Sequence, residues 1–375
     1  MFYVSSYKTR QNLYSMNVVD PQSPLKTVDF FCSAGGVTCG FGQAGLTVLG
    51  GIDVDERCHN TYEVNNPGAR FIHSDISHLT TGTLHDRLNI DRYDDRLIFV
   101  GCSPCQYYSI INTTRDKSSK TRLLLADFEK FVDYFRPGYV LIENVPGLDT
   151  KAGSPLSGFK QNLLRWGYIF DEKIVNANHY GVPQNRKRYI LMATRLNDSI
   201  SIPAGNPDDR PTVIEAIGSD KGFQEITAGH HDSTPFIHTA TRLSDLNIER
   251  LMATPPDGGT RLAWKDNPRL QLRCYQGRDS DFVDVYGRMF WNAPAPTITT
   301  KFNSITNGRF AHPEQHRGIS LREGAMLQSF PSTYRFDSDS TNTIARMIGN
   351  AVPPALARRI GIAFANHYDH ATIQS

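Results

Sequence analysis

The sequence predicts an α/β protein built on a doubly wound, mostly parallel sheet, with a second, smaller irregular domain. Short runs of β-branched and aromatic residues alternate with helix-length segments from Thr27 to about residue 195. This alternation is typical of βαβ units, in which a helix connects two parallel strands. From about residue 196 the alternation stops, and Pro, Gly, Asp and Arg become frequent. The first region therefore predicts the sheet, and the second predicts the irregular domain.

The expected strands are short apolar runs, and each ends near a glycine or a polar residue. Pro67-Gly68 and Pro137-Gly138 end two helix-length segments, and a new apolar run follows each pair. We expect strands at 28–31, 47–52, 71–72, 96–100, 139–142, 168–175 and 188–193. We expect helices from the first glycines to about residue 44, and at 57–64, 123–135, 159–166 and 353–367.

Composition and charge exclude several classes of protein. Hydrophobic residues make up 39% and charged residues 21% of the 375 positions, which is ordinary for a globular protein. The net charge of +2 excludes a generally cationic protein, so contacts with nucleic acid would need locally concentrated charge. The six cysteines do not form the dense pattern of a secreted disulfide scaffold, and no run resembles a signal peptide or membrane span. We expect a cytoplasmic protein with no membrane partner.

Glycines and aspartates stand where the first three expected strands end. Gly35 and Gly36 open a helix, where the backbone can approach a ligand closely. Asp53 ends the second strand at a spacing that suits a carboxylate accepting from ribose hydroxyls. Asp75 ends the third strand, where it could accept from an adenine amino group. Together they predict an adenosine site, although each alone is more often a turn glycine or a helix cap.

The hexapeptide 40–45 matches the G-x-G-x-x-G pattern of dinucleotide-binding proteins. That pattern requires its glycines directly after a strand, whereas these fall within or at the end of the expected helix. The tighter turn from Ser33 to Gly36 lacks the spacing for a pyrophosphate. A cofactor without a pyrophosphate is favoured, and S-adenosylmethionine fits.

A pair of thiols follows the fourth expected strand, in the run Cys102-Ser103-Pro104-Cys105. Ligands bind at this edge of open α/β sheets, so Cys105 is a candidate nucleophile. The same C-x-x-C pattern is typical of thioredoxin-like redox proteins, and two inert buried thiols are a third possibility. No second close cysteine pair completes a zinc site, so we expect no metal.

Glu143 ends the fifth expected strand, at the same edge of the sheet as the thiol. It could donate a proton to a ring nitrogen while a thiolate attacks a neighbouring carbon. Arg186 and Arg188 alternate before the last strand, so both would point to one side of an extended chain. Two guanidinium groups could brace a carboxylate and hold a base or phosphate, although a lone basic run is usually a solvated surface.

These residues, in this order, resemble the DNA cytosine-5 methyltransferases. The resemblance covers about 27–195 and 295–365, and the ordered set of motifs is highly specific. The motifs are DFFCSAGGVTCGFGQAGL (29–46), GIDVDERCHNTYEVNNP (51–67), SDIS (74–77), SPCQYYS (103–109), ENVPGL (143–148), QNRKRYI (184–190), GRFAHPEQHRGISLREGAMLQSFP (308–331) and IGNAVPP (348–354).

The resemblance implies the S-adenosylmethionine-dependent methyltransferase fold and a role for each matched residue. Cys105 is implied as the nucleophile, with Glu143 and Arg188 handling the target base and Arg186 nearby. The residues implied to bind the cofactor are Phe31, Ala34, Gly35, Gly36, Asp53, Val54, Asp75, Ile76, Pro104, Asn350 and Val352. The residues expected to contact DNA are Gln106, Ser109, Arg115, Lys117, Lys120 and Arg122.

Two short departures from the family pattern are visible. Ser33 stands where the family usually has glycine, but Ala34-Gly35-Gly36 is intact, so we expect cofactor binding to survive. Cys102-Ser103 replaces the commoner Gly-Pro or Pro-Pro, which is expected to alter only packing.

The implied reaction transfers a methyl group from S-adenosylmethionine to carbon 5 of a cytosine in duplex DNA, leaving S-adenosylhomocysteine. Attack by Cys105 at carbon 6 activates carbon 5, and the cytosine must first leave the base stack. Three alternatives stay open: an RNA cytosine methyltransferase, an inactive DNA-binding paralogue and a thioredoxin-like oxidoreductase. The Cys-Phe-Thr tripeptide usual in relatives that modify transfer RNA is absent.

The expected organisation is an N-terminal arm (1–26), a catalytic and cofactor-binding domain (27–195), a target-recognition domain (196–300) and a C-terminal segment (301–375) that returns to the catalytic domain. The expected partners are double-stranded DNA, within the nucleoid, and a separate cognate restriction endonuclease; a monomer is expected. The basic residues expected to contact DNA from the target-recognition domain are Arg242, Arg250, Arg261, Lys265, Arg269, Arg273, Arg278 and Arg288.

Overall fold

The computed structural model describes residues 23–104, 123–150, 154–197 and 199–374. These residues form two compact units. The sheet unit comprises the described residues of 23–180, 187–206 and 352–374, and the second unit comprises 181–186 and 207–351. Nearly all of the expected N-terminal arm lies outside the described residues.

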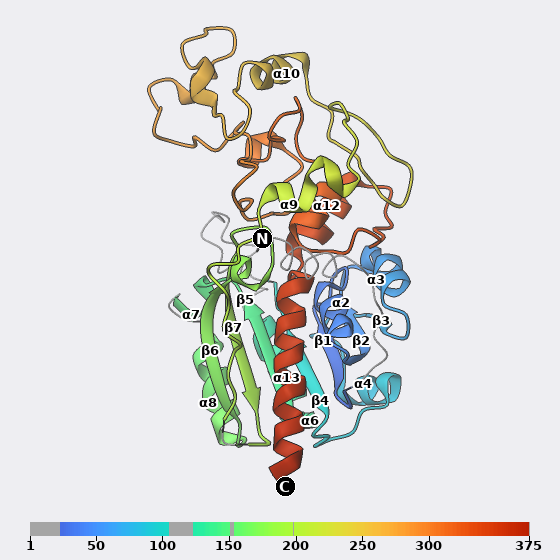
Figure 1. The fold of residues 1–375 in the computed structure, drawn as a ribbon. Coiled ribbons are helices and arrows are strands. Elements are labelled where there is room, and N and C mark those ends of the chain that lie inside the picture. Colours follow the sequence, from blue (N-terminus) through green and yellow to red (C-terminus); the bar gives the residue numbers. More distant parts are fainter. Residues whose placement is uncertain (1–22, 105–122, 151–153, 198, 375) are drawn as a thin grey trace, which may run out of the picture. The chain divides into compact units, whose positions relative to one another are not determined.

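A seven-stranded sheet forms the centre of the sheet unit (Figure 1). Its strands are β1 (Lys26–Phe30), β2 (Thr47–Asp53), β3 (Arg70–His73), β4 (Leu97–Gly101), β5 (Tyr139–Asn144), β6 (Ile169–Asn176) and β7 (Lys187–Thr194). Their order is β3-β2-β1-β4-β5-β7-β6; β7 pairs antiparallel with both β5 and β6, and the other pairs are parallel. The order reverses between β1 and β4, which is where ligands bind in doubly wound sheets. All seven expected strands and the mostly parallel sheet are confirmed.

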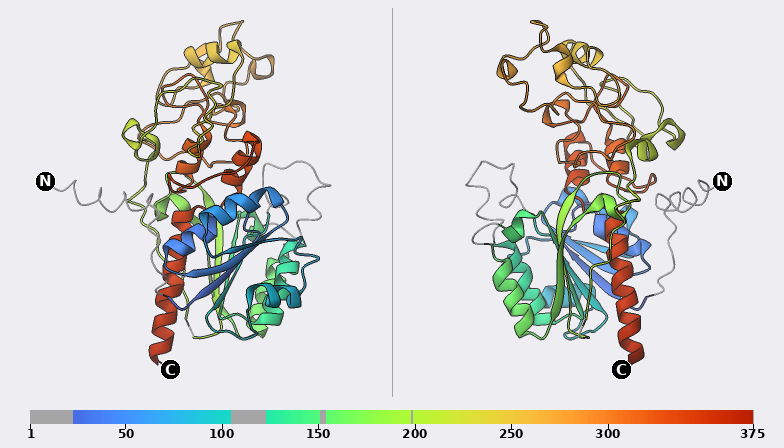
Figure 2. Two further views of the ribbon diagram at one scale, coloured as in Figure 1. Left: turned by 90° about the vertical axis from the view of Figure 1, so that its right-hand side faces the viewer. Right: turned by 60° about the vertical axis from the view of Figure 1, so that its left-hand side comes forward.

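Helices cover both faces of this sheet, so the unit has three layers (Figure 2). The helices are α2 (Gly36–Gln43), α3 (His59–Asn65), α4 (Thr81–Leu88), α6 (Leu124–Phe135), α7 (Gly147–Thr150), α8 (Leu156–Arg165) and α13 (Pro354–Gln374). Side chains of α4, α6 and α8 share one core cluster with the sheet. Helix α4 was not expected from the sequence; Thr80 caps it by accepting from the Thr83 N–H group at 3.0 Å.

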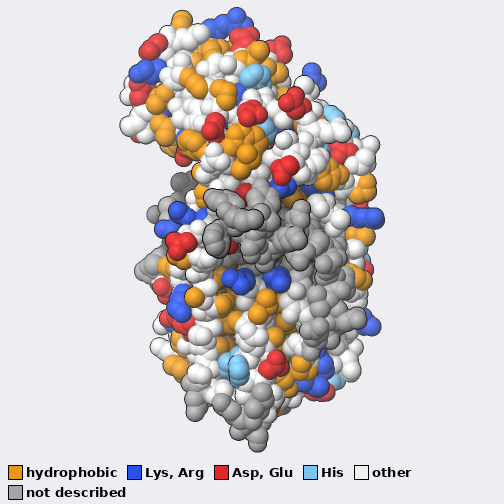
Figure 3. All heavy atoms as spheres, viewed as in Figure 1, with side chains coloured by type: hydrophobic (Ala, Val, Ile, Leu, Met, Phe, Trp, Pro, Cys, Tyr) orange, Lys and Arg blue, Asp and Glu red, His pale blue; other side chains and the backbone are white. Residues whose placement is uncertain are grey.

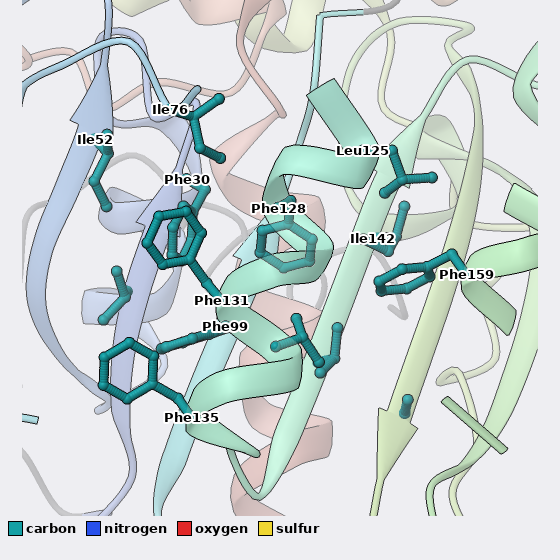
Figure 4. Close-up of a cluster of buried hydrophobic side chains, with 14 of the residues drawn as sticks. Phe30, Ile52, Ile76, Phe99, Leu125, Phe128, Phe131, Phe135, Ile142 and Phe159 are labelled. Carbon is teal, nitrogen blue, oxygen red and sulfur yellow. The ribbon is translucent and has the colours of Figure 1, made fainter. Parts of the chain in front are cut away.

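Aromatic side chains dominate the core between the sheet and α6 (Figure 4). The ring of Phe30 lies 5.1 Å from that of Phe128 and 5.2 Å from those of Phe99 and Phe131. Burial of each such ring stabilises the fold by roughly 2–3 kcal/mol. A Cβ atom at Gly101 would lie 2.8 Å from the Phe128 ring, so glycine allows β4 to end against α6. The ends of β1, β4 and β5 are therefore held by a rigid core.

The glycines of the hexapeptide 40–45 have a packing role. They begin inside α2, as expected, and do not follow a strand directly. A Cβ atom at Gly40 would lie 2.4 Å from the Pro354 carbonyl oxygen and 2.6 Å from the Ala357 Cβ atom. Glycine at this position therefore lets α2 and α13 approach closely on the face opposite the aromatic core.

Irregular chain makes up most of the second unit, as the sequence predicts. Its longer helices are α9 (Val213–Ile217), α10 (Asp245–Met252), α11 (Leu321–Leu327) and α12 (Thr341–Asn350). A small hydrophobic cluster that includes Leu251, Trp264 and Tyr286 lies within it. Backbone carbonyl groups outside regular structure need other donors when they are buried, and arginine side chains supply many of them here.

Arg288 shows this structural use of arginine most fully. Its side chain is completely buried and donates to the carbonyl oxygens of Thr254 at 3.0 Å and Leu251 at 2.7 Å, among others. Arg250 and Arg261 are buried as well, and each donates to backbone carbonyl oxygens. The expectation that these three arginines contact DNA is therefore wrong, because their guanidinium groups are enclosed within the unit.

Surface charge is mixed on the described residues. Basic and acidic side chains are interspersed on the face in view (Figure 3). The other five basic candidates of the target-recognition region are exposed: Arg242, Lys265, Arg269, Arg273 and Arg278. Two of them are paired with acids, Lys265 with Asp279 at 3.0 Å and Arg269 with Glu249 at 2.7 Å. Among the described helices, none has the length and apolar character needed to cross a membrane.

Candidate active site

The loop after β1 has an unusual backbone. Phe31, Ser33 and Gly35 have φ values of 64°, 47° and 85°, so alternate residues lie in the left-handed region. Non-glycine residues adopt this conformation only where surrounding contacts hold them, and such positions cluster at ligand sites. The Asp53 carboxylate stabilises this conformation, because its Oδ2 accepts from the Ser33 N–H group at 2.8 Å.

Asp53 links the ends of β1 and β2. Its second oxygen, Oδ1, accepts from the Asp55 N–H group at 2.8 Å. Burial raises the pKa of this carboxyl group, and the backbone donors oppose that rise. The two N–H donors thus hold Asp53 at the edge of the sheet, where the sequence predicts the ribose contact.

Apolar and polar groups lie beside Asp53 at the ends of β2 and β3. Val54 is 63% exposed, which is unusual for a valine directly after a central strand, whereas Ile76 is buried. Asp75 accepts from the Ser77 N–H group at 2.9 Å, which fixes the turn after β3. An exposed apolar side chain directly after the Asp53 carboxylate suits a flat, partly polar ring such as adenine.

The N-terminus of α2 is the third part of this site. Its N-cap residue is Gly35, which has no side chain to accept from the N–H groups of the first turn. The positive end of the helix dipole there favours an anionic group such as a carboxylate. The residues from 31 to 36 and at 53, 54, 75 and 76 therefore fit a cofactor that combines adenosine with an amino acid.

Ser33 gives the first testable expectation, because serine is strained at a φ of 47°. Replacement of Ser33 by Gly should raise the free energy of unfolding by about 1 kcal/mol, since glycine adopts this conformation without strain. Chemical denaturation measures the change. The matched control is Ser157→Gly in α8, where the same replacement at an exposed helical position should lower stability by roughly 0.5 kcal/mol. Loss of stability in Ser33→Gly would contradict the strain argument.

The end of β4 is tied to the end of β5. The Asn144 side-chain amide donates to the Ser103 carbonyl oxygen at 3.1 Å and to the Ser103 hydroxyl at 3.3 Å. Pro104 is exposed directly after this contact. Cys105 follows and lies outside the described residues, as do Gln106, Ser109, Arg115, Lys117, Lys120 and Arg122. The described part of the loop thus begins beside Glu143.

Glu143 and Arg188 form an ion pair at this sheet edge. The Arg188 Nε atom lies 2.9 Å from the Glu143 Oε1 atom, and the two side chains are only 13% and 10% exposed. The antiparallel pairing of β5 with β7 brings them together, because Glu143 pairs with Ile190, two residues after Arg188. A largely buried pair of this kind is costly to break on one side only.

Cys102 has the environment of a protonated thiol. Burial and the nearby Glu143 carboxylate raise the pKa of Cys102 well above the usual value for cysteine. A redox pair needs a thiolate at neutral pH, so this residue is poorly suited to resolve a mixed disulfide. Among the described cysteines no disulfide is present.

The Cys102→Ser variant separates the methyl-transfer and redox hypotheses. We expect it to keep methyl-transfer activity within about threefold of the wild type, since a small, partly buried thiol is replaced by a hydroxyl of similar size. A radiolabelled methyl-transfer assay on duplex DNA measures this. Complete loss of methyl transfer with the fold retained, as judged by circular dichroism, would contradict this expectation and show that the Cys102 thiol is required.

Arg186 belongs to the second unit, whereas Glu143 and Arg188 belong to the sheet unit. Its side chain is 3% exposed and donates to backbone carbonyl oxygens of residues 298, 349 and 351. Asn350 is exposed at the end of α12 in the same unit, and Val352 is buried at the start of the segment that leads to α13. The base-handling role expected for Arg186 stays a prediction.

Asp29 is a polar residue of the site region that sequence reasoning did not single out. It is 1% exposed in the centre of β1, and its Oδ2 accepts from the Thr38 hydroxyl at 2.9 Å. Burial raises the pKa of Asp29 to about 7, although the Thr38 hydrogen bond opposes the rise. The signal available in the sequence was a carboxylate inside an otherwise apolar strand, between Val28 and Phe30.

The strand order, with an antiparallel β7, is that of the S-adenosylmethionine-dependent methyltransferase fold. The family model for C-5 cytosine-specific DNA methylases matches residues 25–365, so the chain belongs to that family. It is therefore an enzyme, a DNA (cytosine-5-)-methyltransferase, and the resemblance seen in the sequence is confirmed.

Known proteins resemble the chain over nearly its whole length. It is 38% identical over 339 residues to the type II methylase M.HgiDII of Herpetosiphon aurantiacus, covering 89% of this chain and 93% of that protein. It is 28% identical to the type II methyltransferase M1.BsuMI of Bacillus subtilis (strain 168), covering 89% and 78%. A solved structure described as a DNA modification methyltransferase encoded within a prophage (E. coli) superimposes with a TM-score of 0.69 at 23% identity, covering 92% and 99%. That structure supports the fold.

Proposed function

We propose that the enzyme transfers a methyl group from S-adenosylmethionine to carbon 5 of a flipped cytosine at a specific site in duplex DNA. The observation that carries the proposal is the arrangement of four strand ends in one unit. Asp53 and the left-handed loop stand at the ends of β2 and β1, and the Glu143–Arg188 pair stands at the ends of β5 and β7. In this proposal, one edge of the sheet would carry both the cofactor site and the base site.

The cofactor would be held by residues of the sheet unit. Asp53 would accept from the ribose hydroxyl groups, and Val54 and Ile76 would contact the adenine ring, with Asp75 accepting from its amino group. The uncapped N-terminus of α2 would bind the methionine carboxylate. When bound, S-adenosylmethionine supplies an electrophilic methyl group on a sulfonium ion.

The residues that act on the target cytosine would supply the nucleophile and the proton donor. Cys105 would add to carbon 6 of the cytosine, forming a C–S bond as the 5,6 double bond gives its electron pair to the ring. Glu143 would stabilise the adduct by sharing a proton with N3, and Arg188 would hold the Glu143 carboxyl group in place. After methyl transfer, loss of the proton from carbon 5 and departure of the thiolate would restore the aromatic ring.

A cytosine inside a stacked duplex is out of reach of these groups, so the target base would be flipped out of the helix. The expected DNA contacts in residues 106–122 combine four basic side chains with one acidic side chain, which would supply the local positive charge that the chain as a whole lacks. The relatives named as type II enzymes support a role in restriction–modification. A separate cognate endonuclease would then be the partner.

Base-resolution methylation mapping tests the proposed function. Expression in a host without cytosine methylation should produce 5-methylcytosine at one defined sequence in the genomic DNA. In vitro, the purified enzyme should incorporate labelled methyl groups into duplex DNA and leave transfer RNA unlabelled. Preferential labelling of transfer RNA would support the RNA alternative, and no labelling of either would support the inactive DNA-binding paralogue.

A further inference from the structure

Asp29 is a buried carboxylate within β1, just before the left-handed loop of the cofactor site. It lies opposite Gly51 of β2 and Val100 of β4, so strands enclose it on both sides. Its side chain is 1% exposed. Carboxylates are rarely enclosed in this way, because burial disfavours the charged form. Packing alone therefore does not account for a carboxylate at this position.

The two oxygens of Asp29 have different surroundings. Oδ2 accepts from the Thr38 hydroxyl at 2.9 Å, and that hydroxyl lies 3.0 Å from the Tyr62 hydroxyl, which can donate to it. Oδ1 is buried and has no hydrogen-bond partner among the described residues. Asp53 differs, because both of its oxygens accept from backbone N–H groups. Since fewer donors stabilise the charged form of Asp29, its ionisation can respond to a nearby charge.

The charge of Asp29 acts on both sides of the point where the strand order reverses. Burial is the largest cause of the raised pKa of Cys32, after β1, and the charges of Asp53 and Asp29 add to it. Burial is also the largest cause at Cys102, after β4, where the charges of Glu143 and Asp29 raise the pKa further. A ligand bound between the ends of β1 and β4 would therefore lie within reach of the same charge.

We propose that Asp29 is a specificity-determining residue of the cofactor site, whose negative charge favours S-adenosylmethionine over S-adenosylhomocysteine. The inference rests on the proposed function, in which these two molecules are the cofactor and its product. They share the adenosine and amino-acid groups and differ in the sulfonium charge, which is lost with the methyl group. Hydrogen bonds to the shared groups cannot distinguish them, whereas a buried carboxylate can. Asp29 thus favours replacement of the product by the cofactor.

The proposal links binding of the cofactor to loss of a proton from Asp29. Burial raises the pKa of Asp29 to about 7, and the Asp53 charge adds to the rise. Below this pKa the carboxyl group is neutral and gives no preference for a cation; as the pH rises through it, the charge appears and S-adenosylmethionine binds more tightly. Binding of the cation lowers the pKa in turn, so protonated Asp29 releases its proton to the buffer.

Other titratable groups surround Asp29, and none of them discriminates between the two ligands in the same way. They are Tyr62 on α3, Asp53 on β2, Cys32 in the loop and Cys102 after β4. The pKa values of both thiols are well above the usual value for cysteine, so both stay protonated near neutral pH. In the proposed site Asp53 contacts the ribose, which both ligands share.

Isothermal titration of the wild-type enzyme with each ligand tests the inference. For a coupling of about tenfold, affinity for S-adenosylmethionine should rise about fivefold between pH ~5.5 and pH ~7.5, while affinity for S-adenosylhomocysteine changes by less than about twofold. Titrations in two buffers of different ionisation enthalpy should show release of about half a proton at pH ~6.5, with S-adenosylmethionine only. Equal pH dependence for the two ligands would overturn the inference.

The Asp29→Asn variant removes the charge and keeps the size of the side chain. The preference for S-adenosylmethionine over S-adenosylhomocysteine at pH ~7.5 should fall by about five- to tenfold, and the proton release should disappear. The matched control is Asp133→Asn, which removes the same charge from α6, where Asp133 is half exposed and pairs with Arg136; its preference should match the wild type. Wild-type preference and proton release in Asp29→Asn would overturn the inference.

A second variant decides the inference if Asp29→Asn fails to fold. Thr38→Val removes the hydroxyl that donates to Asp29 Oδ2, so the rise in S-adenosylmethionine affinity should move to higher pH by about half a unit. An unchanged midpoint would overturn the inference. A wild-type enzyme that binds neither ligand would refute the proposed function and the inference together, whereas one that binds both with no dependence on pH would refute the inference alone.

Discussion

Replacement of Cys105 by Ala should abolish methyl transfer, lowering kcat by more than about a thousandfold, because in the proposed mechanism the Cys105 thiolate activates carbon 5 by adding to carbon 6. The binding of S-adenosylmethionine should stay nearly intact, since the cofactor residues argued above come from other strand ends. A labelled methyl-transfer assay with saturating enzyme measures the first effect, and isothermal titration measures the second. Normal turnover by this variant would end the covalent mechanism.

A mechanism-based substrate gives the matching positive result. Duplex DNA with 5-fluorocytosine at the target position should form a stable covalent complex with the wild-type enzyme, because fluorine cannot leave carbon 5 as a proton does. The complex should carry the DNA on Cys105, as identified by mass spectrometry of the digested protein. Cys105→Ala should form no such complex, whereas Cys102→Ser should form it as readily as the wild type.

Replacement of Glu143 by Gln should have the second largest effect, lowering kcat by about 100- to 1,000-fold. The amide keeps the size of the side chain but cannot share a proton with N3 of the cytosine. It also leaves the charge of Arg188, whose side chain is only 13% exposed, without its anionic partner. Methyl-transfer kinetics at saturating DNA and cofactor measure the loss of kcat, and thermal unfolding reports the cost to stability.

A double-mutant cycle separates the two consequences of losing Glu143. Arg188→Met combined with Glu143→Gln should recover part of the stability that Glu143→Gln loses, because the uncompensated charge is gone. It should recover none of kcat. Recovery of kcat in the double variant would show that Glu143 acts only through its ion pair and would contradict a role in proton sharing.

The sequence predicted the sheet well because local signals agreed with tertiary packing. The run at β4 is fully apolar and the run at β5 is apolar up to Glu143, and both are bounded by glycine, proline or polar residues, so their position and their burial could be inferred. The position of the G-x-G-x-x-G hexapeptide, which begins inside a helix, could also be predicted from the sequence. Only the absence of a strand immediately before Gly40 was needed to exclude a dinucleotide site.

The functions of the arginines could not be predicted from the sequence. Arg250, Arg261 and Arg288 lie in a polar, irregular region where a basic residue usually faces solvent, yet each is buried and donates to backbone carbonyl groups. The same holds for Arg186, which differs from Arg188 only in what surrounds its guanidinium group. Those carbonyl groups come from segments distant in sequence, and no local pattern encodes such contacts.

The close approach of α2 and α13 at Gly40 has a consequence for how the protein folds. The sheet unit gains its last helix only after residues 207–351, which belong to the other unit, have been synthesised. During translation the face of the sheet beneath α13 therefore stays uncovered while the second unit forms, and docking of α13 requires a contact of very long sequence separation. Folding of the sheet unit should accordingly be slow and late, and its uncovered face is the surface that a chaperone would have to protect.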